Sequence, residues 1–222
     1  LVRPGRHPPN APRLAPLAAC AAKAYDLILG DAGKVFDLTQ EPGDLRDRYG
    51  RNTFGQSCLM ARRLVERGVP YVTINYGGWD HHAKIFPSLD KKLPEFDKGF
   101  SAFLEDMKQR GLLDETLIIW GGEFGRTIYS QGGLSKQNYG RDHHPRCFTM
   151  WMAGAGIKGG QIIGVTDEIG LKAIEKRAHV HDLHATIMHL MGLNHLKTTY
   201  FHNGRNERAT INDGAVIREL VS

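Results

Sequence analysis

The chain has 222 residues, enough for one large domain or two small ones with a substantial core. Its 41% hydrophobic and 24% charged residues are ordinary for a globular protein, and no apolar run reaches the ~18 residues of a membrane span. The net charge of +5 is scattered and lacks interleaved aromatic residues, which argues against a nucleic-acid partner. The simplest explanation of this charge is a solvated surface with a mild excess of Arg and Lys. The positive sign is also compatible with a small anionic ester as a partner.

The first 16 residues hold five prolines and show no periodicity. This composition predicts a disordered leader over residues 1–16, followed by a single domain over residues 17–222. The chain begins with Leu1 rather than Met, which indicates a processed or truncated start. The chain has three cysteines, Cys20, Cys58 and Cys147, and none forms a C-x-x-C pair. Their odd number argues against a disulfide framework, and we interpret Cys58 and Cys147 as buried apolar residues.

Hydrophobic periodicity and helix-end residues predict five helices. They cover residues 17–29, 39–49, 54–67, 89–110 and 180–191. Strand-forming residues predict three strands, over residues 69–75, 116–120 and 147–153. Asn212-Asp213-Gly214 between residues 208–211 and 215–221 predicts a C-terminal hairpin. Because strands alternate with helices, we expect an α/β fold with a mostly parallel sheet flanked by helices on both faces.

Acids and histidines cluster next to each of the three predicted strands. The clusters are Gly77-Gly78-Trp79-Asp80-His81-His82, Gly121-Gly122-Glu123-Phe124-Gly125-Arg126-Thr127 and Gly140-Arg141-Asp142-His143-His144-Pro145. Because functional groups gather at the carboxyl ends of parallel strands, we expect the clusters to converge in space. Asp, Glu and His are ligands for Zn²⁺, Mn²⁺ or Fe, so the pattern indicates a metal site.

Asp80 and His82 are candidate metal ligands, because two glycines before them let the backbone turn sharply toward a ligand. The alternative is that Asp80 caps the next segment and both histidines lie on the surface. Glu123 is interpreted as a metal ligand, a general base or a partner of Arg126, whose guanidinium could bind an anionic group. The alternative is a purely structural ion pair between Glu123 and Arg126.

Asp142-His143-His144 is the densest run of acid and imidazole groups. Adjacent side chains rarely both point inward, so at most one of the two histidines is expected to bind metal, with Asp142 orienting it. His181 opens the predicted helix at 180–191, and His184 and His189 lie within it. These three histidines and His179 before them are interpreted as structural, with Asp182 as an N-cap-type residue.

The sequence lacks a G-x-S-x-G elbow and a P-loop. Gly154-x-Gly156 resembles a G-x-G-x-x-G dinucleotide fingerprint only superficially, because it follows a predicted strand but opens no predicted helix. Thr127 is the only hydroxyl residue next to the candidate site, and no feature marks it as activated.

Taken together, these motifs resemble the C-terminal part of a sulfatase-like bacterial family of unknown function within the alkaline phosphatase superfamily. The resemblance runs from about Phe36 to the C-terminus and rests on several stretches together. They are Asp47-Arg48-Tyr49-Gly50, Phe54-Gly55-Gln56-Ser57, Gly77-Gly78-Trp79-Asp80-x-His82, Gly122-Glu123-Phe124-Gly125-Arg126-Thr127, Gly140-Arg141-Asp142-His143-x-Pro145, Gly156-Ile157-Lys158-Gly159-Gly160 and Asp182-Leu183-His184-Ala185-Thr186-Ile187.

The resemblance implies an alkaline phosphatase-like sheet, incomplete in this chain, and one or two divalent metal ions, with Zn, Mn or Ca as candidates. It places metal ligands at Asp80, His82, Glu123 and His143, and an aromatic residue is more usual at the position of His144. It also implies that the nucleophile lies in an N-terminal half outside this chain, which would be a partner, and that the parent protein is periplasmic or extracellular.

Two functions remain open from the sequence. The first is a metal-dependent hydrolase of phosphate or sulfate esters, in which Arg126 binds the anionic oxygens. The second is a non-catalytic binding or scaffold domain that a metal ion stabilises. The resemblance favours the first, and the absence of a recognisable nucleophile favours the second.

Overall fold

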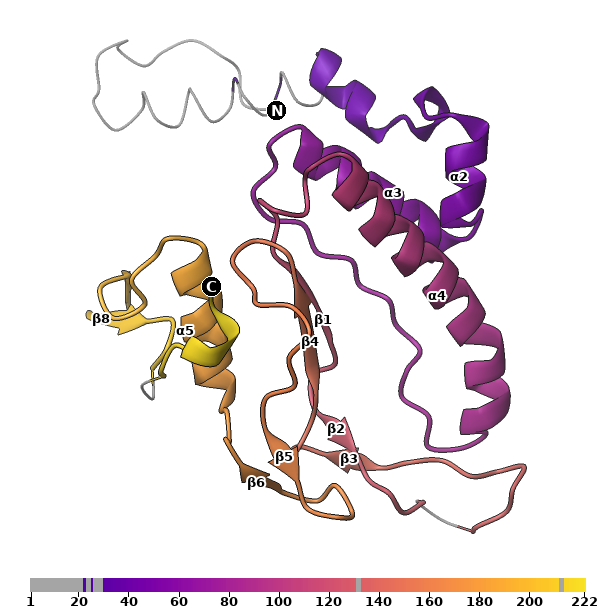
Figure 1. Cartoon of the computed structure of the whole chain (residues 1–222), viewed down its shortest axis with the longest axis vertical. Coiled ribbons are helices and arrows are strands. Elements are labelled where there is room, and N and C mark those ends of the chain that lie inside the picture. Colours follow the sequence, from indigo (N-terminus) through magenta and orange to yellow (C-terminus); the bar gives the residue numbers. More distant parts are fainter. Residues whose placement is uncertain (1–21, 23–24, 26–29, 131–132, 212–213) are drawn as a thin grey trace.

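The computed structural model describes residue 22, residue 25 and residues 30–130, 133–211 and 214–222 (Figure 1). The predicted leader at 1–16, Cys20 and nearly all of the predicted helix at 17–29 lie outside the described residues. The described helices are η1 (Asp31–Phe36), η2 (Leu38–Gln40), α2 (Gly43–Tyr49), α3 (Thr53–Glu66), α4 (Ile85–Gln109), α5 (Val180–Leu190) and η3 (Arg218–Leu220). The strands are β1 (Ile118–Gly121), β2 (Gly125–Arg126), β3 (His143–His144), β4 (Met150–Ala153), β5 (Val165–Thr166), β6 (Ala173–Glu175), β7 (Thr199–His202) and β8 (Arg205–Arg208).

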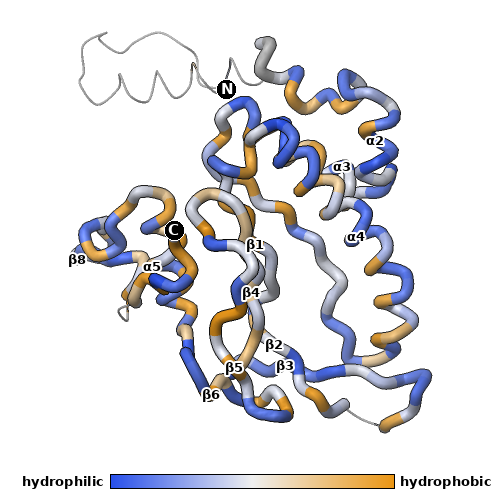
Figure 2. The backbone as a smooth tube through the Cα atoms, viewed as in Figure 1, coloured by the Kyte–Doolittle hydropathy of each residue, from blue (hydrophilic) through white to orange (hydrophobic). Residues whose placement is uncertain are grey.

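The core forms where α3 packs against α4. Hydrophobic and hydrophilic residues alternate along α4 at helical spacing, so one stripe of the helix faces α3 (Figure 2). A Cβ atom added to Gly99 of α4 would lie 3.1 Å from the Cα of Gly55 in α3. Two glycines therefore allow the helices to approach closely where they cross. The buried residues of this core are Tyr49, Phe54, Cys58, Leu59, Ala61, Ala102, Phe103, Met107 and Ile118.

A buried network of ion pairs joins α3 to α4 and to the turn before α2. The guanidinium of Arg62, which is 1% exposed, lies 2.8 Å from a carboxylate oxygen of Glu41, 3.0 Å from Asp106 and 2.7 Å from Glu66. The Tyr49 hydroxyl donates a hydrogen bond of 2.8 Å to Asp106. Burial of a charge is costly unless it is paired, and here one cation is shared among three carboxylates.

The strands form four separate two-stranded antiparallel sheets, ordered β1-β4, β2-β3, β5-β6 and β7-β8. In the β1–β4 pair, Ile118 is opposite Ala153 and Trp120 is opposite Trp151. The expected fold class is therefore wrong, because the described residues contain only short antiparallel pairs and no extended parallel sheet flanked by helices.

The physical reason lies in how the three predicted strands pair. The runs at 116–120 and 147–153 form strands at Ile118–Gly121 and Met150–Ala153, but they pair with each other in antiparallel register. Residues 69–75 are extended without joining a sheet. A short apolar run does not specify which strand it pairs with. The uninterrupted apolar run at 116–120 was expected to be a central parallel strand, and that prediction is wrong.

The predicted C-terminal hairpin is also misplaced. The hairpin consists of β7 and β8, and Asn203 and Gly204 form its turn with φ of 48° and 82°. Asn-Gly favours this left-handed two-residue turn, whereas the predicted turn at 212–214 overlaps the undescribed residues 212–213.

At the N-terminus of α5, the side chains of His179 and Asp182 form a reciprocal capping box, so Asp182 does contribute to the cap.

No helix among the described residues is long and apolar enough to cross a membrane.

Candidate metal centre

Three segments that are distant in the sequence meet beyond the ends of the extended run 70–76 and of β1. They are residues 77–85, residues 122–127 and residues 139–144 (Figure 1). The amide of Arg141 donates to the carbonyl of His81 at 2.8 Å, and the amide of Ile85 donates to the carbonyl of Tyr139 at 2.9 Å. The β2–β3 pair places Arg126 opposite His143. Backbone hydrogen bonds thus bring the three predicted clusters together.

Gly140 permits the closest of these approaches. A Cβ atom at this position would lie 2.0 Å from the backbone carbonyl of His82, a distance that no side chain can occupy. The glycine is therefore required by proximity rather than by an unusual backbone angle, and it sets the distance between the segment carrying His82 and the segment carrying His143.

Three potential ligand atoms form a nearly equilateral triangle. The Nε2 atoms of His82 and His143 each lie 3.0 Å from Oδ1 of Asp80, and 3.2 Å separates the two nitrogens. Ligand atoms around an ion with bonds of ~2.0–2.1 Å are ~3.3 Å apart in a tetrahedron and ~2.9 Å apart in an octahedron. The triangle therefore has the size of one face of a metal coordination sphere.

Hydrogen bonds alone do not satisfy these three ligand atoms well. If both imidazoles donate to Asp80, their N–H groups crowd each other across 3.2 Å. If one Nε2 instead accepts a proton from the other, its lone pair faces the carboxylate. A cation in contact with all three atoms removes both conflicts. Two imidazoles and one carboxylate suit Zn²⁺, Mn²⁺ or Fe²⁺ better than Ca²⁺, which takes oxygen ligands.

Arg126 lies at the edge of the triangle and holds two carboxylates. One nitrogen of its guanidinium donates to Oδ1 of Asp80, and the other lies 3.1 Å from Glu123. Its central carbon is 5.2 Å from the centre of the Phe124 ring. Glu123 is thus separated from Asp80 by Arg126 and does not belong to the cluster of Asp80, His82 and His143. The structural alternative for Glu123 and Arg126, an ion pair, is present.

Asp80 is half exposed, and its environment favours the charged form. The hydrogen bond from His143 lowers the pKa of this carboxyl most. Desolvation opposes that effect, and the positive charge of Arg126 and its hydrogen bond add to the lowering, so that the net shift is downward. A carboxylate that stays ionised is the form that binds a metal ion.

The side chains of Asp142 and Thr127 hold the backbone of the segment that carries His143 and do not act as reactive groups. Oδ1 of Asp142 accepts a hydrogen bond from the His143 amide at 2.7 Å and lies 3.9 Å from Nδ1 of His82. The Thr127 hydroxyl donates to the carbonyl of Tyr129 and accepts from the amide of Asp142, and the residue is 2% exposed. It is therefore not available as a nucleophile in this arrangement.

His144 and the histidines of α5 do not belong to the cluster. His144 is buried and its Nε2 lies 2.8 Å from the carbonyl of Leu171. The histidines at 179, 181, 184 and 189 belong to the N-cap and body of α5.

One residue that sequence reasoning missed is Lys92 of α4. Its ammonium donates to the carbonyl of Gly77 at 2.8 Å and lies 4.0 Å above the Tyr76 ring and 5.1 Å from the Trp79 ring. It thereby ties the loop carrying Asp80 to α4. No signal in the sequence distinguishes it from the other lysines of a predicted amphipathic helix.

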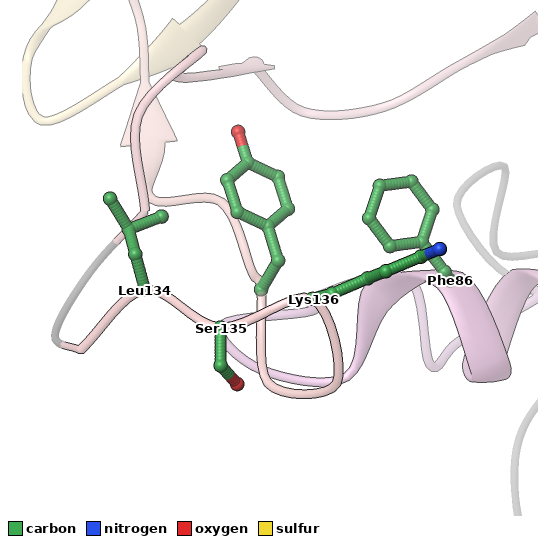
Figure 3. A pocket seen from close by; sticks show the side chains of 5 residues that line it. Phe86, Leu134, Ser135 and Lys136 are labelled. Carbon is green, nitrogen blue, oxygen red and sulfur yellow. The ribbon is translucent and has the colours of Figure 1, made fainter.

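A shallow cavity of about 320 Å³ adjoins the two segments that carry His82 and His143 (Figure 3). Its lining is Phe86, Leu134, Ser135, Lys136 and Tyr139. The rings of Phe86 and Tyr139 stack at 5.8 Å, four residues along the chain from His82 and His143 respectively. The cavity is thus built by continuations of the segments that carry the two histidines.

Comparison with protein families identifies one match over nearly the whole chain. The chain belongs to the family described as protein of unknown function (DUF1501), whose model matches residues 4–221. No curated protein and no solved structure matches it. The match indicates no sulfatase or alkaline phosphatase family, so the resemblance inferred from the motifs is wrong. The family description carries no activity.

Proposed function

We propose that this member of the DUF1501 family binds one divalent metal ion through Asp80, His82 and His143, and hydrolyses a phosphate or sulfate ester there. The observation that carries the proposal is the triangle of ligand atoms, with edges of 3.0, 3.0 and 3.2 Å. Three protein ligands with a remaining open position are typical of catalytic rather than structural zinc sites.

The surroundings of the triangle agree with this role. All three side chains are more than one-third exposed, so a small ester could reach the ion from solvent. A bound divalent ion would polarise the ester and activate water. Asp142 would hold the backbone of His143, and Lys92 would hold the loop of Asp80, so both ligands are positioned by neighbouring residues.

Arg126 would supply positive charge next to the ion. Its guanidinium now binds Asp80 and Glu123, and once Asp80 shares its charge with a metal, Arg126 can turn toward an anionic oxygen of the ester. This release is the step that the hydrolase proposal requires of Arg126. Glu123, on the far side of the guanidinium, would keep the side chain extended.

A second function has its own supporting observation. The Thr127 hydroxyl is buried and doubly hydrogen bonded, and Arg126 is paired with two carboxylates. A buried hydroxyl and an arginine already paired with two carboxylates, although not with all of its five N–H donors, fit a domain in which the metal ion joins the three segments and performs no chemistry.

The two functions separate in one set of measurements. Purified chain is titrated with Zn²⁺ by calorimetry and then assayed with 4-nitrophenyl phosphate and 4-nitrophenyl sulfate, as wild type, Asp80→Ala and the control His81→Ala. Stoichiometric binding and turnover in wild type and the control, both lost in Asp80→Ala, support the hydrolase. Binding without turnover supports the metal-stabilised domain, and absence of binding in wild type refutes both.

A further inference from the structure

Residues 71–76 form an extended run that pairs with no strand of the described chain (Figure 1). Their exposure alternates, with Tyr71, Thr73 and Asn75 exposed and the residues at 72, 74 and 76 half-buried. Alternation with period two is the signature of a strand whose one face is covered. No backbone hydrogen bond to residues 70–76 is found within the part of the chain that the structure describes.

The covered face lies on the helical core. Val72, Ile74 and Tyr76 pack against the cluster of α3 and α4. The Tyr76 ring stacks on Phe54 at 4.3 Å, and Phe54 in turn stacks on Phe96 at 5.3 Å. The side chains of this run are therefore anchored, while its backbone groups are not satisfied by protein.

The β1–β4 pair lies on the same helical layer. The ring of Trp120 in β1 is 5.2 Å from Phe96, and the ring of Trp151 in β4 is 5.3 Å from Phe100. Phe96 of α4 thus contacts Trp120 directly. It also stacks on Phe54, which in turn stacks on Tyr76. Both aromatic residues of α4 are only half-buried beneath these two elements.

The two elements also run in the same direction. Asp80 follows residues 70–76, Glu123 follows β1, and Arg126 joins the two carboxylates at one end. Figure 1 shows residues 70–80 as a long extended run between α4 and the β1–β4 pair. Among the residues that the structure describes, β1 pairs only with β4, so its other edge also carries unpaired backbone groups.

We propose that the edges of residues 70–76 and of β1 take up one extended strand from a partner polypeptide, which inserts between them and pairs with both. Unpaired donors and acceptors on two edges that run side by side over one helical layer specify a β-strand rather than a helix or a lipid. The strand carries apolar residues at alternate positions, toward Phe96 and Phe100, and polar residues between them. This inference does not depend on the metal centre.

The probe is a synthetic eight-residue peptide, obtained by selecting a displayed library of random octapeptides against the intact chain, from which we expect sequences with alternating apolar and polar residues. Two N-methylated versions are then made, one with methyl groups on the odd amides and one on the even amides. A central strand donates its amides alternately to the neighbour on each side. Both versions should therefore lose about tenfold or more in affinity, measured by fluorescence anisotropy.

Other results would overturn the proposal. Loss of affinity with only one of the two methylated versions would mean addition at a single edge. Enrichment of peptides without alternation, or no enrichment at all, would mean that the edges do not bind a strand. A chain that is dimeric in light scattering, and becomes monomeric in Thr73→Pro, would make a second copy the occupant in place of a separate partner.

The variant Thr73→Pro also tests the position of the strand. Proline removes one backbone donor from residues 70–76 while leaving an exposed position that packs against nothing in the core. The parent peptide should bind this variant about tenfold or more weakly and should bind the control Thr73→Ser unchanged. Equal binding to both, with unchanged circular dichroism, would contradict the assignment.

Discussion

At the scale of single residues, Asp80 links all the interactions of the candidate centre. Its Oδ1 atom is the contact of His82, His143 and Arg126 at once. One oxygen shared by three nitrogen groups concentrates positive partners on a single carboxylate. The consequence is a depressed pKa in the metal-free protein, which can be observed directly.

The carboxyl of Asp80 in the metal-free chain should titrate with a midpoint below its ordinary value of 3.8 in a carbon-detected NMR titration. Since the His143 hydrogen bond is the largest cause, His143→Ala should raise the midpoint. A lowered pKa means that the charged form stabilises the folded state above pH ~4, and that this contribution disappears as the pH falls through the folded pKa. A midpoint at or above 3.8 would contradict the geometry.

Gly140 makes a second prediction at this scale. In Gly140→Ala, the new methyl group collides with the His82 carbonyl, so stability should fall by about 1–3 kcal/mol and Zn²⁺ binding should weaken. Gly77→Ala is the matched control in the same centre, because a Cβ atom there meets no atom within 4 Å. Its stability should stay within about 1 kcal/mol of wild type in urea denaturation. Equal effects of the two substitutions would refute the role of Gly140.

At the scale of elements, the helices α3 and α4 and the network around Arg62 hold the molecule together. Arg62 extends from α3, while its partners Glu41 and Asp106 belong to the turn before α2 and to α4. Burial tends to raise the pKa of Glu41, and the hydrogen bonds from Arg62 and Arg63 outweigh that effect and lower it. The network therefore contributes stability above the ordinary pKa of Glu41 and loses it in acid.

Arg62→Met should lower the free energy of unfolding by about 1–3 kcal/mol in urea denaturation at neutral pH, because the buried carboxylates of Glu41 and Asp106 each lose one of their two cationic partners and keep only Arg63 and Arg110, respectively. The control is Arg67→Met, at an exposed position one residue beyond α3, which should change stability by less than about 0.5 kcal/mol. A loss below 1 kcal/mol in Arg62→Met would show that these carboxylates are solvated after all.

The elements also show what the sequence could and could not predict. Amphipathic spacing located α3 and most of α4 and α5, because a helix is specified by contacts within its own segment. Strand pairing depends on residues elsewhere, so the parallel sheet and the C-terminal hairpin were wrong while the runs at 116–120 and 147–153 did contain strands. In the candidate centre, residue types placed Asp80, His82 and His143 together, but the position of Glu123 beyond Arg126 required the geometry.

At the scale of the whole molecule, the chain is a helical core with small sheets around it and an unpaired extended run beside that core. Hydrogen exchange should reveal this hierarchy. Amides of α3 should exchange on the order of 10³-fold or more slowly than those of residues 71–76, which have no described backbone acceptor. Mass spectrometry of peptic fragments measures both regions in one experiment. Equal protection would mean that residues 71–76 are paired in the isolated chain.

The central claim is that Asp80, His82 and His143 form the first coordination shell of one metal ion. Zinc K-edge X-ray absorption of the chain loaded with one equivalent of Zn²⁺ tests it most directly. We expect nitrogen and oxygen neighbours at ~2.0–2.1 Å with the scattering signature of two imidazoles, reduced to one imidazole in His143→Ala. A spectrum without imidazole scattering, or one that His143→Ala leaves unchanged, would contradict the account.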